Sequence, residues 1–326
     1  MSTIVVTGGA GFIGSHLCEA LLLKGNKIIN IDSFNDYYEP MIKRNNVKET
    51  QDFVETNAIP SDRYLVQEGD IRDFEFLNRV FEENEVDTIV HLAASAGVRP
   101  SIHNPVLYTD VNINGTVNLL EISKKYNIKS FVFASSSSVY GNNSKVPFAE
   151  GDVVDFPISP YAATKKAGEL LCHTYHSLYE INMACLRFFT VYGPRQRPDL
   201  AIYKFTKLIS EGLPIPYYGD GSTERDYTYI EDIIDGVTKA IQWAGEGEGK
   251  YEVFNLGESN TISLNRMVEA IEHEVGKKAE INRMPMQPGD VNRTFADVSK
   301  AKQDLGYNPK WHFEDGISKF VEWFKG

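Results

Sequence analysis

A glycine-rich turn between a strand and a helix constrains this chain more than any other feature. An apolar run, Thr3–Thr7, leads into the turn, and a helical pattern follows over Phe12–Lys24. The glycines have the spacing G-x-x-G-x-x-G, and small residues there let the backbone approach a pyrophosphate at the positive end of the helix. The turn therefore predicts a dinucleotide site that includes Gly8, Gly11, Phe12, Ile13 and Gly14.

Short apolar runs alternate with amphipathic stretches through the first half of the chain. Such alternation indicates α/β class, with a doubly wound parallel sheet covered by helices on both faces. Asn35–Asp62 is an insertion, predicted as a helix followed by a loop. The remaining predicted strands are Lys27–Ile31, Arg63–Gln67, Asp87–Leu92 and Ser130–Ser135, and the predicted helices are Phe74–Glu83, Val106–Tyr126 and Tyr161–Tyr179.

The second half of the chain differs from the first in its proline content and in the spacing of its predicted strands. Most prolines lie beyond residue 140, and the strands after Pro194 are short and irregularly spaced. This pattern suits a smaller α/β lobe packed over the end of the sheet. A length of 326 residues also suggests two units at about 150 residues each. We expect a nucleotide-binding domain at 1–190, to which later segments return, and a substrate-binding lobe mainly at 191–326.

Composition excludes several classes of function. The 33 lysines and arginines against 45 aspartates and glutamates give a net charge of −12, which argues against nucleic-acid or membrane partners. The three cysteines, Cys18, Cys172 and Cys185, are predicted to be reduced core thiols of a cytoplasmic protein. His173 and His176 have no third ligand nearby, so no metal is predicted.

A carboxylate and two strand ends complete the predicted dinucleotide site. Asp32 ends the second predicted strand about 20 residues after the turn, where a carboxylate binds the ribose hydroxyls. It would repel a 2′-phosphate, and no arginine stands beside it, so NAD is favoured over NADP. Asp70 and Ile71 follow the third strand, where the aspartate could reach the adenine. Leu92, Ala93 and Ala94 end the fourth strand and allow close approach to the cofactor.

Tyr161 and Lys165 indicate general-base chemistry at a hydroxyl group. They lie at i and i+4 on one helix face, and an ammonium near a phenol is expected to lower the phenol pKa. Such a pair supplies a general base for removing a proton from a hydroxyl. Ser136 belongs to a serine cluster at the end of the fifth strand, where its hydroxyl could bond both the reacting alcohol and the tyrosine.

The sequence resembles the extended short-chain dehydrogenase/reductase superfamily in its nucleotide-sugar epimerase/dehydratase branch. The resemblance rests on T-G-G-A-G-F-I-G, H-L-A-A, V-N-I-N-G-T, S-S-V-Y-G, S-P-Y-A-A-T-K and R-D-Y-T-Y-I-E-D. It implies a Rossmann domain with a smaller C-terminal lobe, and catalytic roles for Ser136, Tyr161 and Lys165. It also implies a homodimer formed through the helices predicted near Val106–Tyr126 and Tyr161–Tyr179.

The branch contains epimerases, 4,6-dehydratases and decarboxylases, all of which first oxidise C4 of the sugar. Dehydratase relatives carry Asp-Glu just before the Val-Tyr-Gly motif, and decarboxylating relatives carry a glutamate there. This chain has Ser137-Ser138. The resemblance therefore implies 4-epimerisation of a UDP-sugar through a 4-keto intermediate. A noncatalytic NAD-binding sensor on the same fold is a distant alternative.

The stretch Phe188–Asp199 resembles the UDP-glucuronate 4-epimerase group, and UDP-glucuronate is the favoured substrate. The alternative is a neutral or N-acetylated hexose 4-epimerase. Arg197 is the candidate anchor for the sugar carboxylate, because guanidinium supplies two parallel donors. Arg195 and Arg197 could instead bind the diphosphate or a surface carboxylate. The full set of expected substrate contacts is Arg99, Ser136, Ser137, Thr190, Arg197, Arg225 and Asp290.

Overall fold

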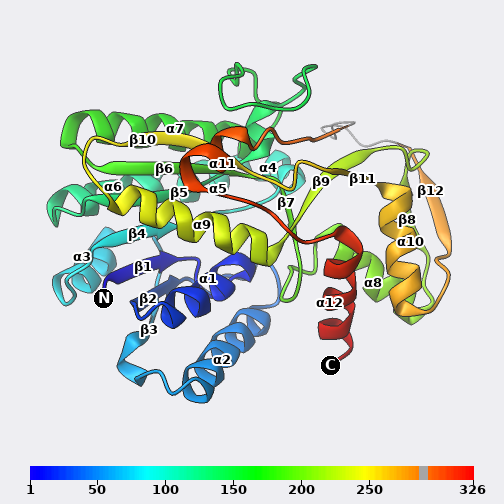
Figure 1. Ribbon diagram of the computed structural model, residues 1–326, viewed down its shortest axis with the longest axis horizontal. Coiled ribbons are helices and arrows are strands. Elements are labelled where there is room, and N and C mark those ends of the chain that lie inside the picture. Colours follow the sequence, from blue (N-terminus) through cyan, green and yellow to red (C-terminus); the bar gives the residue numbers. More distant parts are fainter. Residues whose placement is uncertain (286–292) are drawn as a thin grey trace.

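Figure 1 shows a parallel sheet between layers of helices, with a second lobe at one end. The computed structural model describes residues 1–285 and 293–326. Within these residues the large sheet has seven parallel strands, in the spatial order β10 (Tyr251–Leu256), β6 (Asn182–Phe188), β5 (Ser130–Ser136), β4 (Thr88–His91), β1 (Thr3–Thr7), β2 (Lys27–Asp32) and β3 (Tyr64–Glu68). The predicted doubly wound α/β fold is confirmed.

Two buried cores cover the faces of this sheet. Successive strand residues point to opposite faces, so Ile4 and Val6 of β1 join one core while Val5 joins the other. This two-sided burial explains why the strands are apolar at nearly every position. Helices α1 (Phe12–Leu23), α2 (Pro40–Thr56) and α9 (Ile230–Gly245) cover the first face, and α3 (Phe74–Glu82), α6 (Gly115–Lys125) and α7 (Pro160–Tyr179) cover the second.

The second lobe is built from two small sheets and short helices. Strands β7 (Thr190–Tyr192), β9 (Glu224–Tyr229) and β11 (Thr261–Ser263) form one sheet, and β8 (Ile215–Tyr218) pairs with β12 (Ile281–Met284). Its helices are α8 (Ala201–Glu211), α10 (Leu264–Val275) and α12 (Phe313–Lys325), whereas α11 (Ser299–Leu305) packs against α9 and β10 of the large sheet. The core under α1 and α9 continues without a break into this lobe. Since α9 and β10 return to the large sheet, the boundary at residue 190 stays a prediction.

One predicted helix is interrupted. The sequence predicts a single helix over Val106–Tyr126, but the structure has α5 (Pro105–Thr109), a π-helical turn at Asp110–Asn114 and then α6. The π turn carries Asn112, whose amide bonds both backbone groups of Ser95 and donates to Thr164 Oγ1 at 3.0 Å. Such turns are frequent at functional sites. Here the turn ties α7 to the loop after β4. A further short helix, α4 (Val98–His103), begins in that loop.

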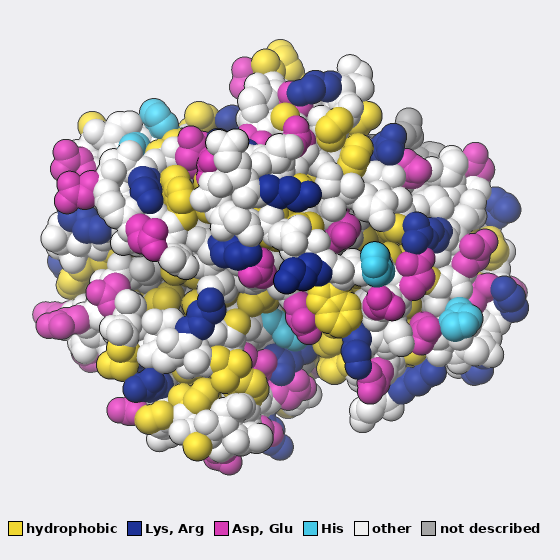
Figure 2. Space-filling view, in the orientation of Figure 1, with side chains coloured by type: hydrophobic (Ala, Val, Ile, Leu, Met, Phe, Trp, Pro, Cys, Tyr) yellow, Lys and Arg dark blue, Asp and Glu magenta, His cyan; other side chains and the backbone are white. Residues whose placement is uncertain are grey.

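The surface shown in Figure 2 carries interspersed basic and acidic side chains. Among the described residues, no helix has both the length and the apolar character that crossing a bilayer requires. The three cysteines are free and buried, as predicted.

Candidate active site

The glycine turn has a geometry that only glycine satisfies at two positions. Gly8 has φ +73°, and a Cβ there would lie 2.8 Å from the backbone nitrogen of Ala93. A Cβ on Gly14 would lie 2.2 Å from the carbonyl oxygen of Gly8. Without side chains, the turn leaves the first residues of α1 accessible at the N-terminal end of the helix, the site at which proteins bind pyrophosphate.

A cavity of about 520 Å³ lies beside this turn. It opens at the carboxyl ends of β1 and β4, where the strand order reverses, which is the ligand site of doubly wound sheets. The glycine cradle, the helix end and the carboxylate of Asp32 together fit a dinucleotide. Every predicted cofactor residue lines the cavity: Gly8, Gly11, Phe12, Ile13, Gly14, Asp32, Asp70, Ile71, Leu92, Ala93, Ala94, Tyr161 and Lys165.

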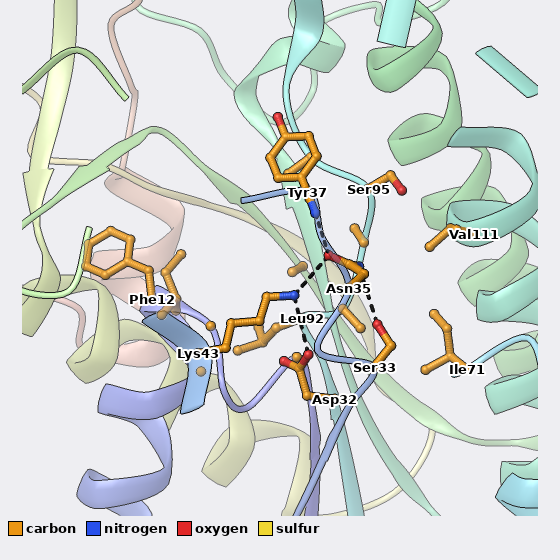
Figure 3. Close-up of a pocket in the computed structure, with 18 of the residues that line it drawn as sticks. Phe12, Asp32, Ser33, Asn35, Tyr37, Lys43, Ile71, Leu92, Ser95 and Val111 are labelled. Atoms are coloured by element: carbon orange, nitrogen blue, oxygen red, sulfur yellow. Dashed lines mark hydrogen bonds and ion pairs between the residues drawn. The ribbon is translucent and has the colours of Figure 1, made fainter. Parts of the chain in front are cut away.

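Asp32 is held in place by the backbone and by a lysine. Its Oδ1 accepts from the backbone of Phe34 at 2.9 Å, and its Oδ2 accepts from Ala10 at 3.3 Å. Lys43 Nζ lies 3.5 Å from Oδ1, and both side chains are buried. Figure 3 shows this lysine and Asn35 in the cavity wall. Sequence reasoning missed Lys43, because nothing in the insertion indicates which face of α2 meets the end of β2.

Asp70 lies in the cavity wall but already has a partner. Its Oδ2 accepts from Arg72 Nη2 at 2.7 Å, and the same guanidinium pairs with Asp110. Hydrogen bonding from Arg72 lowers the pKa of Asp70, so the carboxyl is ionised at neutral pH. The contact between Asp70 and an adenine stays a prediction.

A second cavity of about 370 Å³ adjoins the first and shares Tyr161 and Arg197 with it. The only charged residues among its described lining are Arg197 and Arg225, and no aspartate or glutamate is among them. The predicted substrate residues that line it are Ser136, Ser137, Thr190, Arg197 and Arg225.

Of the predicted substrate residues, Arg99 is not brought to this cavity. Arg99 is not among the described residues that line either cavity; its guanidinium lies 5.4 Å from the ring centre of Tyr218 in the second lobe. Asp290 lies outside the described residues. The roles of both residues stay predictions.

Tyr161, Ser136 and Lys165 meet where the two cavities join. Burial raises the pKa of Tyr161, and the hydrogen bond to Ser136 and the charge of Arg197 oppose that rise, with a net upward shift. Lys165 Nζ lies 5.9 Å from the Tyr161 ring centre and donates to the carbonyl of Ala134 at 2.7 Å. Burial lowers the pKa of Lys165 to about 8. Burial dominates at the phenol and the hydrogen bond of Lys165 goes to Ala134, so the lowering of the phenol pKa by Lys165 stays a prediction for the protein with its cofactor.

A buried ion pair lies directly behind these residues. Glu169, one helical turn after Lys165, accepts from Arg187 Nε and Nη2 at 2.8 Å each, and both side chains are at most 2% exposed. The same carboxylate accepts from Ser135 Oγ at 2.6 Å. The pair thus joins α7, β5 and β6 beside Ser136. Sequence reasoning missed it, because Glu169 and Arg187 read singly as ordinary helix and strand residues.

Arg195 and Arg197 have different surroundings. Arg195 pairs with Glu19 and Glu49, which matches the carboxylate alternative given above. Arg197 donates hydrogen bonds from Nε and Nη2 to the Asp199 carboxylate at 2.9 and 2.8 Å. Its guanidinium lies 5.4 Å from the ring centre of Tyr37. Among the described residues Nη1 of Arg197 has no hydrogen-bond acceptor, and the side chain borders both cavities. Arg197 can therefore offer a donor to a bound sugar without leaving Asp199.

Comparison with known families matches residues 5–320 to the model described as GDP-mannose 4,6 dehydratase. The chain belongs to that family. As a member of the GDP-mannose 4,6 dehydratase family it has the fold and glycine turn described above, but it carries Ser137-Ser138 where the resemblance places acidic residues in dehydratases. Membership alone therefore does not establish dehydration.

Individual proteins similar to this chain are 4-epimerases of UDP-sugars. A UDP-glucuronate 4-epimerase of Thermodesulfobacterium geofontis is 42% identical over 326 residues, covering 100% of this chain and 97% of the relative. The crystal structure of UDP-glucuronic acid 4-epimerase from Bacillus cereus with UDP-glucuronic acid and NAD matches at a TM-score of 0.89, 37% identity and 99% of each chain. A UDP-glucose 4-epimerase of Thermus thermophilus with NAD matches at a TM-score of 0.86, 32% identity and 99% of each chain.

Proposed function

We propose that this protein is an isomerase that epimerises UDP-glucuronate to UDP-galacturonate at C4, with NAD as its cofactor. The observation that carries the proposal is the second cavity, whose described lining has Arg197 and Arg225 as its only charged residues. Two guanidinium groups suit a substrate with both a diphosphate and a sugar carboxylate. The similarity to UDP-glucuronate 4-epimerases over the full length of the chain supports the same assignment.

The chemistry follows from the positions of Tyr161 and Ser136. Ser136 bonds the C4 hydroxyl and Tyr161, and the Tyr161 phenolate removes the hydroxyl proton. A bound NAD would supply the acceptor for the hydride that leaves C4 and the donor for its return. The 4-keto sugar then rotates in the cavity so that its opposite face meets the cofactor. Tyr161 returns the proton when C4 is reduced on that face.

The residues that follow β5 predict that the product is an epimer and that little sugar is dehydrated or decarboxylated. Ser137 and Ser138 offer no carboxyl group for elimination, and no aspartate or glutamate is among the described residues lining the cavity. We expect the C4 epimer to account for nearly all product from UDP-glucuronate. NMR of the reaction mixture checks this, with UDP-glucose and UDP-N-acetylglucosamine as separate substrates. A UDP-pentose as the main product would contradict the assignment.

Arg197→Met tests which part of the substrate Arg197 binds. If Arg197 binds the sugar carboxylate, turnover of UDP-glucuronate falls roughly 10–150-fold relative to any turnover of UDP-glucose, the worth of one hydrogen bond to a charged group. The fraction of decarboxylated product should also rise, because a 4-keto uronic acid loses CO₂ once its carboxylate turns freely. Equal losses on both sugars would place Arg197 on the diphosphate and favour the neutral-sugar epimerase.

The assembly and the compartment are also part of the proposal. Exposed apolar side chains lie on α5 (Val106, 77% exposed) and on α7 (Leu170 and Leu178, 57% and 64%). We infer a homodimer formed through these helices, which light scattering of the purified protein will test against a mass of 36.7 kDa per chain. The buried free cysteines support a cytoplasmic location.

A further inference from the structure

A buried lysine in the wall of the cofactor cavity has no part in the function described so far. Lys43 lies on α2, within the insertion between β2 and β3, and is 6% exposed. In Figure 3 its ammonium group points into the wall where Asp32 and Asn35 lie. A lysine is almost never this deeply buried unless it is paired, so the contacts of the ammonium define its role.

The Lys43 ammonium makes one hydrogen bond and one ion pair. Nζ donates to Asn35 Oδ1 at 3.0 Å and lies 3.5 Å from Asp32 Oδ1. The ring of Tyr38 approaches to 5.2 Å from Nζ. Among the described residues no other hydrogen-bond acceptor is found for this ammonium, so it keeps donor capacity for a ligand in the cavity that Lys43 lines.

The position of Lys43 and Asp32 indicates which part of a bound dinucleotide they would contact. Asp32 ends β2, where doubly wound proteins bind the adenosine ribose through a carboxylate. The Oδ2 atom of Asp32 accepts only from Ala10 among the described residues and keeps a lone pair for a ribose hydroxyl. An ammonium 3.5 Å from Oδ1 is within reach of the same ribose.

The charge of Lys43 affects the expected selectivity for NAD over NADP. Asp32 alone would repel a 2′-phosphate, but with Lys43 beside it the two side chains carry no net charge. Two further cations on this side of the molecule, Arg44 and Arg72, pair with Glu68 and with Asp70 and Asp110 respectively. Selectivity thus depends on a balance between one carboxylate and one buried ammonium.

We propose that Lys43 is a cofactor-binding residue that shares the adenosine ribose with Asp32 and that becomes a receptor for a 2′-phosphate when the charge of Asp32 is removed. The proposal rests on the NAD dependence proposed above, and it is independent of the sugar. It predicts that one substitution at Asp32 is enough to admit NADP, and that this gain requires a cation at position 43.

The test compares bound dinucleotides in Asp32→Asn, Asp32→Asn/Lys43→Met and Asp32→Asn/Lys43→Arg with the wild type. Each purified protein is incubated with an equimolar excess of NAD and NADP and passed through gel filtration. The bound dinucleotides are then released and quantified. Lys48→Met, which removes an exposed charge from the same helix, is the matched control. Circular dichroism confirms that each variant is folded.

We expect the wild type and Lys48→Met to hold mainly NAD. In Asp32→Asn the ratio of bound NADP to NAD should rise about 10–150-fold, the worth of one charge-assisted hydrogen bond, and Lys43→Arg should preserve that rise. Lys43→Met should abolish it. The same ratio in Asp32→Asn and in Asp32→Asn/Lys43→Met would overturn the role of Lys43. A wild type that holds neither dinucleotide would overturn the NAD dependence itself.

Discussion

Replacing Tyr161 with phenylalanine will lower turnover of UDP-glucuronate about 10²–10⁴-fold, the usual contribution of a general acid–base group. The phenol hydroxyl is the group at the junction of the two cavities that can exchange a proton with the C4 hydroxyl while bonded to Ser136. The ring remains in the variant, so its edge contact with Tyr108 and the shape of the site are preserved.

Substrate affinity and cofactor content separate this effect from misfolding. Tyr161→Phe should bind UDP-glucuronate within a few-fold of the wild type by calorimetry and should retain NAD. Tyr227→Phe is the matched control, because Tyr227 is buried and lines neither cavity. Tyr161→Phe with nearly normal turnover would remove this residue from the mechanism.

Arg187→Met will cost about 3–5 kcal/mol in the free energy of unfolding at neutral pH, measured by urea denaturation, because removing one partner of a buried ion pair leaves the other charge without compensation. In the wild type, burial raises the pKa of Glu169, but hydrogen bonds and charge from Arg187 outweigh this and hold the pKa below its ordinary value. Arg266→Met is the control, because its pair with Glu314 is about half exposed and worth no more than about 1 kcal/mol.

The pH dependence follows from the sign of these shifts. In the wild type, the stability gained from ionised Glu169 is present above the ordinary glutamate pKa and is lost as the pH falls through the lowered folded-state value. In Arg187→Met, the largest force that opposes burial at Glu169 is lost, although the Ser135 hydrogen bond and the Lys166 charge remain, so the pKa of Glu169 rises and protonation in acid relieves the uncompensated charge. The difference in stability between the two proteins should therefore shrink as the pH falls. A constant difference across the acid range would contradict this account.

Local patterns were enough to predict the catalytic end of the site. The glycine turn, Asp32 and Ser136 lie at the carboxyl ends of strands of one parallel sheet, which meet at one edge, and Tyr161 and Lys165 lie in the first turns of α7. Their convergence on the two adjoining cavities follows from that topology.

Residues that act through tertiary contacts could not be predicted in this way. Lys43 reaches Asp32 because of how α2 lies over the end of β2, and no periodicity in the insertion encodes that placement. Glu169 and Arg187 are 18 positions apart, and their pairing depends on the packing of α7 against β6. The π turn at Asp110–Asn114 depends on the bonds that Asn112 makes with residues before and after it in the chain.

The unbroken core beneath the two lobes limits how a sugar nucleotide enters and turns. Leu17 of α1, Phe205 of α8 and Met267 of α10 belong to the same buried cluster. A hinge rotation that exposed about 400 Å² of this surface would cost roughly 10 kcal/mol. The shared core therefore strongly favours the closed arrangement of the two lobes, and we expect entry to depend mainly on side chains and loops at the rim. If the lobes stay together, the keto sugar must rotate within the second cavity, and we expect the size of the ring and its substituents to limit, alongside the charge of Arg197, which sugars can be epimerised.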